Sequence, residues 1–160
     1  TTTTAPVPFT GEAISQFHVN FASGYDVTYV WDPALGWKRF SQTSTPFMSA
    51  TSPPTQISVT NVIVNFIPYG GGGGDGNMIG TGTSWIFSNG NLIKGTWTKA
   101  NDADITHYTD AAGAPIRITP GRTWVELLPL DKTVDVVAAP VPPTTVAAPV
   151  TTAPKAKKKK

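Results

Sequence analysis

An Asn-Gly pair between two β-rich runs constrains the fold of this chain more than any other feature. Residues 85–87 are β-rich, Ser88-Asn89-Gly90-Asn91 follows them, and the next β-rich run extends from Leu92 to Trp97. A type I′ turn needs positive φ at both of its central residues, and Asn and Gly accept that conformation most readily. An Asn-Gly pair in this setting therefore indicates a two-residue hairpin. The pair predicts an antiparallel β fold.

Alternating apolar and polar residues extend this interpretation to most of the chain. Phe17, Val19 and Phe21 alternate with polar neighbours, as expected for a strand with one buried face. The run from Ile57 to Tyr69 is apolar on both faces, which is typical of a central strand. We expect an all-β fold, a single antiparallel β-sandwich or partly closed barrel of about eight strands. The other strands are predicted at residues 25–31, 37–41, 78–87, 92–99, 105–109, 115–119 and 122–128.

The two ends of the chain differ in composition from its middle. Residues 1–8 are rich in Thr and Pro, and residues 138–154 contain only Ala, Pro, Val and Thr. Frequent proline removes backbone donors and favours an extended, solvated chain. We therefore predict a linker at 1–8, a β domain at 9–130 and a disordered tail at 131–160.

The formal net charge of +2 comes from a lysine cluster at the end of the tail. Residues 1–154 carry seven cationic and ten anionic side chains, a net charge of −3. A nucleic-acid-binding domain would have a basic face on its folded part, so we expect no specific nucleic-acid partner. The cluster can contact anionic polymers or lipid headgroups, with a gain on the order of 1 kcal/mol per basic residue, or it can be a solvated terminus. Its members are Lys155, Lys157, Lys158, Lys159 and Lys160.

Several kinds of chemistry find no support in the sequence. Cysteine is absent, which excludes disulfides, thiolate metal sites and a cysteine nucleophile. The glycine run at 70–76 lacks the Gly-Lys-Ser/Thr ending of a phosphate loop, so it is a linker between strands or a mobile lid over a ligand. The two histidines cannot be placed in a catalytic triad without knowledge of geometry. We predict no catalytic residue, no metal and no cofactor, and a non-catalytic role is favoured.

Tryptophans next to charged side chains provide the best candidate for a binding site. Strand alternation places Trp37 beside Arg39, and Trp124 beside Arg122 and Glu126, on one side of each strand. An aromatic ring near a guanidinium and a carboxylate suits stacking on a sugar or peptide while polar groups form hydrogen bonds. Alternatively, Trp97 and Trp124 belong to the core, and Arg122 and Glu126 form an ion pair at its rim. The candidate ligand-binding residues are Trp37, Arg39, Arg122, Trp124, Glu126 and Asn61. The last of these lies in an apolar strand and can instead hydrogen-bond the backbone of a neighbouring loop.

An ordered series of short motifs resembles a known family. The motifs are Trp31-Asp32, Trp37 to Arg39, Asn61 to Val64, Gly80 to Gly82, Ser88 to Lys99, Asp110 to Gly113 and Pro120 to Leu127. Together they resemble the C-terminal domain of the YerB-like lipoproteins, a bacterial family whose function is not established. The resemblance covers roughly residues 14–129. It implies an exported, lipid-anchored parent protein with an additional N-terminal domain, and the anchor and that domain lie outside this chain.

These observations lead to one expected function and two alternatives. We expect a non-catalytic, extracytoplasmic binding or scaffolding module of a bacterial envelope lipoprotein, with cell-wall glycan or peptide as ligand. One alternative is a cell-wall hydrolase that uses Glu126 and an aspartate as paired carboxylates, which must lie about 5–10 Å apart. The other is a purely structural domain that packs on the N-terminal domain of the parent protein. In each case the expected location is outside the cytoplasm, attached to the membrane through a lipid anchor.

Overall fold

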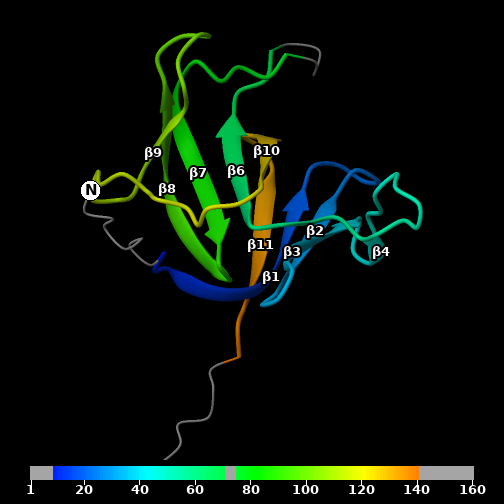
Figure 1. The fold of residues 1–160 in the computed structure, drawn as a ribbon. Helices are drawn as coiled ribbons and strands as arrows, with labels where there is room; N and C mark the ends of the chain where they lie inside the picture. The colour runs from blue at the N-terminus through cyan, green and yellow to red at the C-terminus, as the bar shows by residue number, and fades with distance from the viewer. Residues whose placement is uncertain (1–8, 71–74, 141–160) are drawn as a thin grey trace, which may run out of the picture.

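The computed structural model describes residues 9–70 and 75–140, and these residues form β-strands and connecting loops without a helix. No segment of these two ranges is therefore a helix that could span a membrane. Figure 1 shows how the strands are arranged. They are β1 (Glu12–Asn20), β2 (Val27–Asp32), β3 (Gly36–Ser41), β4 (Thr45–Pro46), β5 (Ser58–Val59), β6 (Asn61–Ile67), β7 (Gly80–Ser88), β8 (Asn91–Lys99), β9 (His107–Thr109), β10 (Thr123–Pro129) and β11 (Thr133–Ala138).

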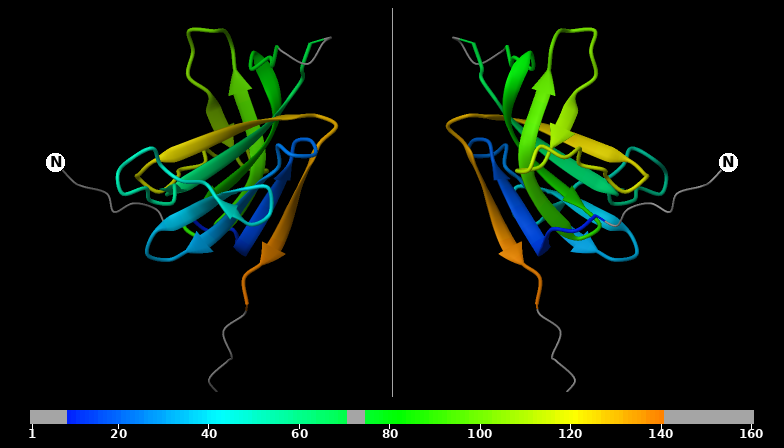
Figure 2. Two further views of the ribbon diagram at one scale, coloured as in Figure 1. Left: turned by 90° about the vertical axis from the view of Figure 1, so that its right-hand side faces the viewer. Right: turned by 90° about the vertical axis from the view of Figure 1, so that its left-hand side faces the viewer.

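The strands form one sheet that curls into a half-barrel. Its main path runs β10-β6-β7-β8-β1-β2-β3-β4, while β11 pairs with β1, β5 with β3 and β9 with β8. The two side views in Figure 2 show this curl, with β11 in orange lying beside β1 in blue. The predicted all-β fold with a partly closed barrel is confirmed.

The predicted hairpin joins β7 to β8. Ser88 pairs with Asn91, and the two residues between them have positive φ, 49° at Asn89 and 72° at Gly90. A side chain at Gly90 would also meet the indole of Trp31, since a Cβ there would lie 2.7 Å from its Nε1. Glycine is therefore required at this position by both backbone conformation and space.

One strand pair departs from the antiparallel pattern. β10 runs parallel to β6, in a register from Thr123 opposite Asn61 to Pro129 opposite Ile67. The chain leaves β6, forms the β7–β8 hairpin and then returns along residues 100–122 to the free side of β6. A strand that returns by such a long connection can run in either direction, and here it runs parallel.

The tail predicted to begin at residue 131 is wrong, because the sheet continues to residue 138. β11 pairs with β1 in an antiparallel register that includes Phe17 opposite Val136 and Asn20 opposite Thr133. Val134 is 7% exposed and packs in the core. The physical reason is the alternation of valines with polar residues in this segment, which gives β11 a face to bury. The predicted linker at 1–8 and the lysine cluster lie outside the described residues.

One other segment also differs from its prediction. Residues 115–119 were expected to form a strand, but they form only an isolated bridge between Thr109 and Pro115. This segment instead crosses the outer face of the sheet, where Ile116 and Ile118 pack on a small core of Phe9, Ile63 and Ile86. Of the glycine run at 70–76, residues 71–74 lie outside the described ranges.

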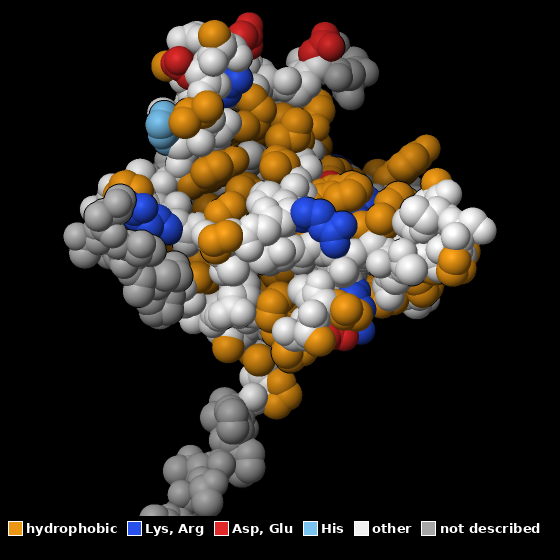
Figure 3. Space-filling model, in the orientation of Figure 1, with side chains coloured by type: hydrophobic (Ala, Val, Ile, Leu, Met, Phe, Trp, Pro, Cys, Tyr) orange, Lys and Arg blue, Asp and Glu red, His pale blue; other side chains and the backbone are white. Residues whose placement is uncertain are grey.

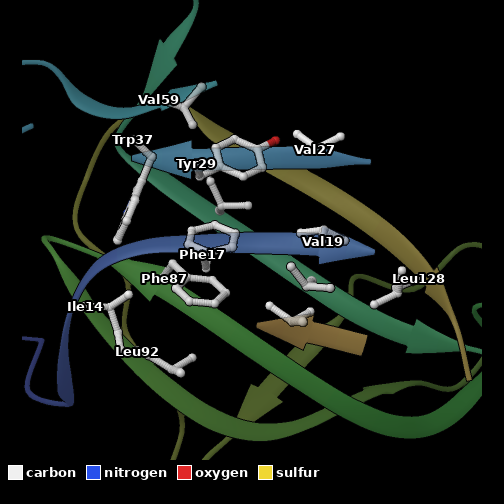
Figure 4. Packing of buried hydrophobic residues seen from close by; sticks show 13 residues of the cluster. Ile14, Phe17, Val19, Val27, Tyr29, Trp37, Val59, Phe87, Leu92 and Leu128 are labelled. Carbon is white, nitrogen blue, oxygen red and sulfur yellow. The ribbon is translucent and has the colours of Figure 1, made fainter. Parts of the chain in front are cut away.

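The main core fills the concave side of the half-barrel and is rich in aromatic rings. The ring of Phe17 stacks on that of Phe87, with centroids 3.5 Å apart, and on Tyr29 at 4.9 Å. Trp37 meets Phe17 edge-on at 5.1 Å. All four side chains are fully buried, and Figure 4 shows their rings packed between β1, β2, β3 and β7. These four rings fill the interior between the strands that carry them. Space for a ligand can therefore exist only beyond this ring cluster.

Candidate functional site

A cavity of about 640 Å³ opens near the seam where β10 faces β2 and β3 across the interior. It lies next to the rings of the main core. Its wall is formed mainly by aromatic and apolar side chains, and three charged side chains also line it. The lining includes Phe21, Tyr25, Tyr69, Arg39, Glu126 and Asp131.

Arg39 projects from β3 between two aromatic rings. It lies opposite Tyr29 of β2 in the sheet register, so both side chains point to the concave side. Its guanidinium carbon is 4.2 Å from the ring centroid of Phe47 and 4.9 Å from that of Trp124. Cation–π contacts of this kind stabilise a partly desolvated guanidinium. The two rings thus fix the position of the charge at the cavity.

Glu126 comes from β10 and meets Arg39 and Tyr29 from the other side. Its side chain is buried, and its Oε1 accepts a hydrogen bond of 2.6 Å from the hydroxyl of Tyr29. Arg39 Nε lies 3.8 Å from the same oxygen, close enough for charge attraction but too far for a hydrogen bond. The three side chains therefore link β2, β3 and β10 across the interior of the half-barrel.

Burial shifts the pKa values of two side chains in this cluster, Glu126 and Tyr29. Burial raises the pKa of Glu126 above its usual value, although the hydrogen bond from Tyr29 and the charge of Arg39 partly oppose that shift. Burial and the nearby Glu126 likewise raise the pKa of Tyr29, so its hydroxyl stays protonated and donates. Arg39 Nε is buried without a hydrogen-bond partner among the described residues. The cluster therefore retains a donor that protein groups leave unused.

The raised pKa of Glu126 predicts a specific pH dependence of stability. The native state binds the Glu126 proton more tightly than the unfolded state, so this group contributes most at low pH and loses its contribution as pH rises from the unfolded to the folded pKa. Relative to Glu126→Gln, which does not titrate, the wild-type free energy of unfolding should fall as pH rises above about 4.3. Urea denaturation of both proteins between pH 3 and 8 measures the difference. A difference that grows in favour of the wild type would contradict the shift.

The structure brings together three of the six candidate residues and separates the others. Arg39 and Glu126 line the cavity, and the Trp124 ring contacts the Arg39 guanidinium beside it. Trp37 is fully buried under the core rings, so the expectation that a ligand stacks on it is wrong. Arg122 is exposed, precedes β10 and does not line the cavity. Its carbonyl accepts hydrogen bonds from the backbone N–H groups of Thr60 and Asn61.

Asn61 belongs to a buried polar row on the outer face of β6 and β7. Its Nδ2 donates to the Thr119 carbonyl at 2.9 Å and to Thr123 Oγ1 at 3.1 Å, and its Oδ1 accepts from the Ser88 hydroxyl at 2.7 Å. These bonds hold the segment at 115–123 on the sheet. The structure supports the alternative that this asparagine hydrogen-bonds a neighbouring loop, and it places the side chain away from the cavity.

Sequence patterns missed several residues of the site. Tyr29 lies in the strand predicted at 25–31, but its contact with Glu126 joins residues 97 positions apart. Phe47 lies between the strands predicted at 37–41 and 57–69, where no strand was expected. Tyr25 and Tyr69 lie just outside β2 and β6, where alternation no longer predicts to which side of the sheet a side chain points. Tyr25 is 78% exposed, which makes it the most open aromatic ring of the cavity.

A second carboxylate also lines the cavity. Asp131 follows β10 and pairs with Lys132 at 3.2 Å, and its side chain is 72% exposed. Within 9–70 and 75–140, no group of three or more His, Asp or Glu side chains is arranged to hold a metal ion. Figure 3 shows one face of the molecule, where charged side chains are few among hydrophobic and polar ones. The chemistry that the described side chains offer at the cavity is hydrogen bonding, ring stacking and proton binding.

Comparison with known proteins agrees with this fold. The family described as the C-terminal domain of a protein of unknown function, DUF3048, matches residues 17–125. The crystal structure of the YerB protein from Bacillus subtilis is similar, with a TM-score of 0.58 and 20% sequence identity. The match covers 79% of this chain and 45% of the YerB chain. No curated protein matches the chain.

Proposed function

Because the chain belongs to the DUF3048 C-terminal domain family, whose function is unknown, we propose a role from its site: a non-catalytic binding module of a bacterial envelope lipoprotein. The single observation that carries this proposal is the cavity beside Arg39 and Glu126. It combines apolar walls with a few convergent polar groups, which is the usual composition of a ligand site.

Exposed aromatic surface at the cavity supports binding. Tyr25 is 78% exposed, and nearby Leu130 is 63% exposed. Apolar groups that stay open to solvent next to a concave site commonly mark a contact surface. Ring stacking on Trp124, as first expected, gives way to stacking on Tyr25, because Arg39 lies over the Trp124 ring.

The proposed location is outside the cytoplasm, with a lipid anchor in another part of the parent protein. It rests on the resemblance to the YerB-like lipoproteins and on the Pro/Thr-rich composition of both chain ends. Cell-wall glycan or peptide is the proposed ligand, because both are abundant at the envelope and both suit aromatic rings with hydrogen-bonding neighbours. Contact of the lysine cluster with anionic polymers or lipid headgroups stays a prediction.

Titration with soluble cell-wall fragments tests the binding role. We expect muropeptides from digested cell walls to shift the ¹H–¹⁵N signals of the Trp124 indole and the Tyr25 amide in the full chain. Tyr25→Ala should weaken binding about tenfold, the equivalent of one lost stacking contact of about 1.4 kcal/mol. Ile105→Ala, which removes an apolar side chain that is 73% exposed and lies outside the cavity lining, is the control. Unchanged spectra with fragments at millimolar concentration would refute binding at this cavity.

A second candidate function is the paired-carboxylate hydrolase. Glu126 with its raised pKa and Asp131 line one cavity, as an acid and a base of a glycosidase would. Release of soluble sugar from cell walls, abolished in both Glu126→Gln and Asp131→Asn, would favour it over simple binding.

A third candidate is a structural domain that packs on the N-terminal domain of the parent protein. The match to YerB leaves more than half of that chain outside the similar region. Solvent protection of Tyr25 and Arg39 in the full-length parent, compared with this chain alone, would favour it.

A further inference from the structure

The cavity presents one positive and one negative side chain next to each other. Arg39 and Glu126 approach to 3.8 Å at its base, and their charges cancel when both are ionised. A ligand with a net charge gains little from such a pair, because attraction to one group is offset by repulsion from the other. Asp131 at the rim is itself paired with Lys132 at 3.2 Å, so this second pair adds no net charge either. The cavity therefore favours a neutral ligand.

The same pair offers a hydrogen-bond donor and an acceptor side by side. Arg39 supplies only donors, and its Nε is buried without a partner among the described side chains. A carboxylate at Glu126 is an acceptor, with one oxygen already bonded to Tyr29. Neighbouring hydroxyls of a sugar ring match this arrangement, because each hydroxyl accepts one bond and donates another. The C=O and N–H of a single trans peptide group point in opposite directions, so one peptide group cannot contact both residues at once.

Aromatic side chains line the cavity around Arg39 and Glu126. Phe21, Tyr25 and Tyr69 line the wall, and the Tyr69 hydroxyl is held by the Leu127 carbonyl at 2.9 Å, which fixes its ring. The Tyr25 ring is largely open to solvent. Sugar rings have apolar C–H faces and polar edges, so they can contact these aromatic rings while their hydroxyls reach Arg39 and Glu126.

We infer that the cavity binds a neutral sugar ring of a glycan through a pair of neighbouring hydroxyls held by Arg39 and Glu126. This inference rests on the proposed binding function and specifies its ligand class. The guanidinium donates to one hydroxyl, and the adjacent hydroxyl donates to the carboxylate. Tyr25 covers the face of the ring. No bond is made or broken.

A panel of defined tetrasaccharides tests this inference on the full chain. The probes are chitotetraose, cellotetraose and maltotetraose, which are neutral, and tetragalacturonate, which is anionic. We expect at least one neutral tetrasaccharide to shift the signals of Tyr25, Glu126 and the Trp124 indole, and to bind at least tenfold more tightly than tetragalacturonate. Glu126→Gln keeps the size of the side chain but removes the charge, and it should weaken binding about tenfold.

Tyr25→Ala keeps the test decisive if Glu126→Gln is poorly folded. Its side chain is largely exposed, so the variant should fold, yet it should weaken the neutral sugar about tenfold. Ile105→Ala should bind as the wild type does. Equal or tighter binding of tetragalacturonate, or shifts confined to residues outside the cavity, would overturn the inference. If N-acetylated peptide amides shift the cavity signals and no sugar does, the sugar inference fails while the binding module stands. If muropeptides, sugars and peptides all leave the cavity unchanged, both fail.

Discussion

Replacing Phe17 with alanine should lower the free energy of unfolding by about 3–5 kcal/mol, the usual cost of removing a fully buried Phe side chain. Phe17 has no exposed surface and sits between the rings of Phe87 and Tyr29, with Trp37 against its edge. Each stacked pair adds about 0.5–1.5 kcal/mol beyond the area it buries. The three surrounding rings belong to three different strands, so they cannot close over the gap without shifting the sheet.

Urea denaturation followed by tryptophan fluorescence measures this loss. Ile105→Ala is the control, because its side chain is 73% exposed and its removal should change stability by less than about 0.5 kcal/mol. A loss below about 1 kcal/mol for Phe17→Ala would contradict the packing, since it would mean that the ring is not part of a closed core.

Local sequence signals predicted the parts of the fold that depend on neighbouring residues. The Asn89-Gly90 turn requires positive φ at two adjacent positions, and only a few residue types provide it. The alternation in β1 predicted which side chains are buried, because Phe17 and Val19 must share a face. In both cases the structural consequence lies within a few residues of its cause.

Long-range pairing could not be predicted in the same way. The parallel contact of β10 with β6 depends on where a long loop returns, and nothing in the alternation of β10 specifies the direction of its partner. β11 was hidden for a different reason. Its valines lie next to an Ala/Pro/Val/Thr-rich stretch, and composition averaged over that stretch masked the alternation at 133–138.

The candidate site shows what strand alternation can and cannot provide. Alternation correctly placed Trp37 and Arg39 on one face of β3. It did not indicate which of the two side chains lies in the closed core and which lies at the open end. Trp37 lies under the rings of β1 and β7, whereas Arg39 lies at the open end where β10 crosses. The meeting of Arg39 with Glu126 depends on the curl of the whole sheet. Arg39, Trp124 and Glu126 could be predicted from the sequence as candidates, but their contacts could not.

Replacing Asn61 with alanine should lower the free energy of unfolding by about 1–3 kcal/mol and leave ligand binding unchanged. The side chain is fully buried, and its loss removes a partner of the buried Ser88 hydroxyl and of the Thr119 carbonyl. A buried polar group left unpaired costs about this much. Asn77→Ala removes an exposed side chain that accepts one exposed hydrogen bond, from the Ile79 backbone; it should change stability by about 0.5 kcal/mol or less and is the control.

This variant separates a structural role from a binding role at a residue for which the sequence allowed both. Asn61→Ala should denature at lower urea concentration but, while folded, should titrate with cell-wall fragments as the wild type does. Tyr25→Ala should behave in the opposite way, because an exposed ring contributes to binding and little to folding. If Asn61→Ala instead kept its stability and lost binding, the ligand site would include the polar row on β6 and β7. The cavity beside Arg39 and Glu126 would then not explain binding by itself.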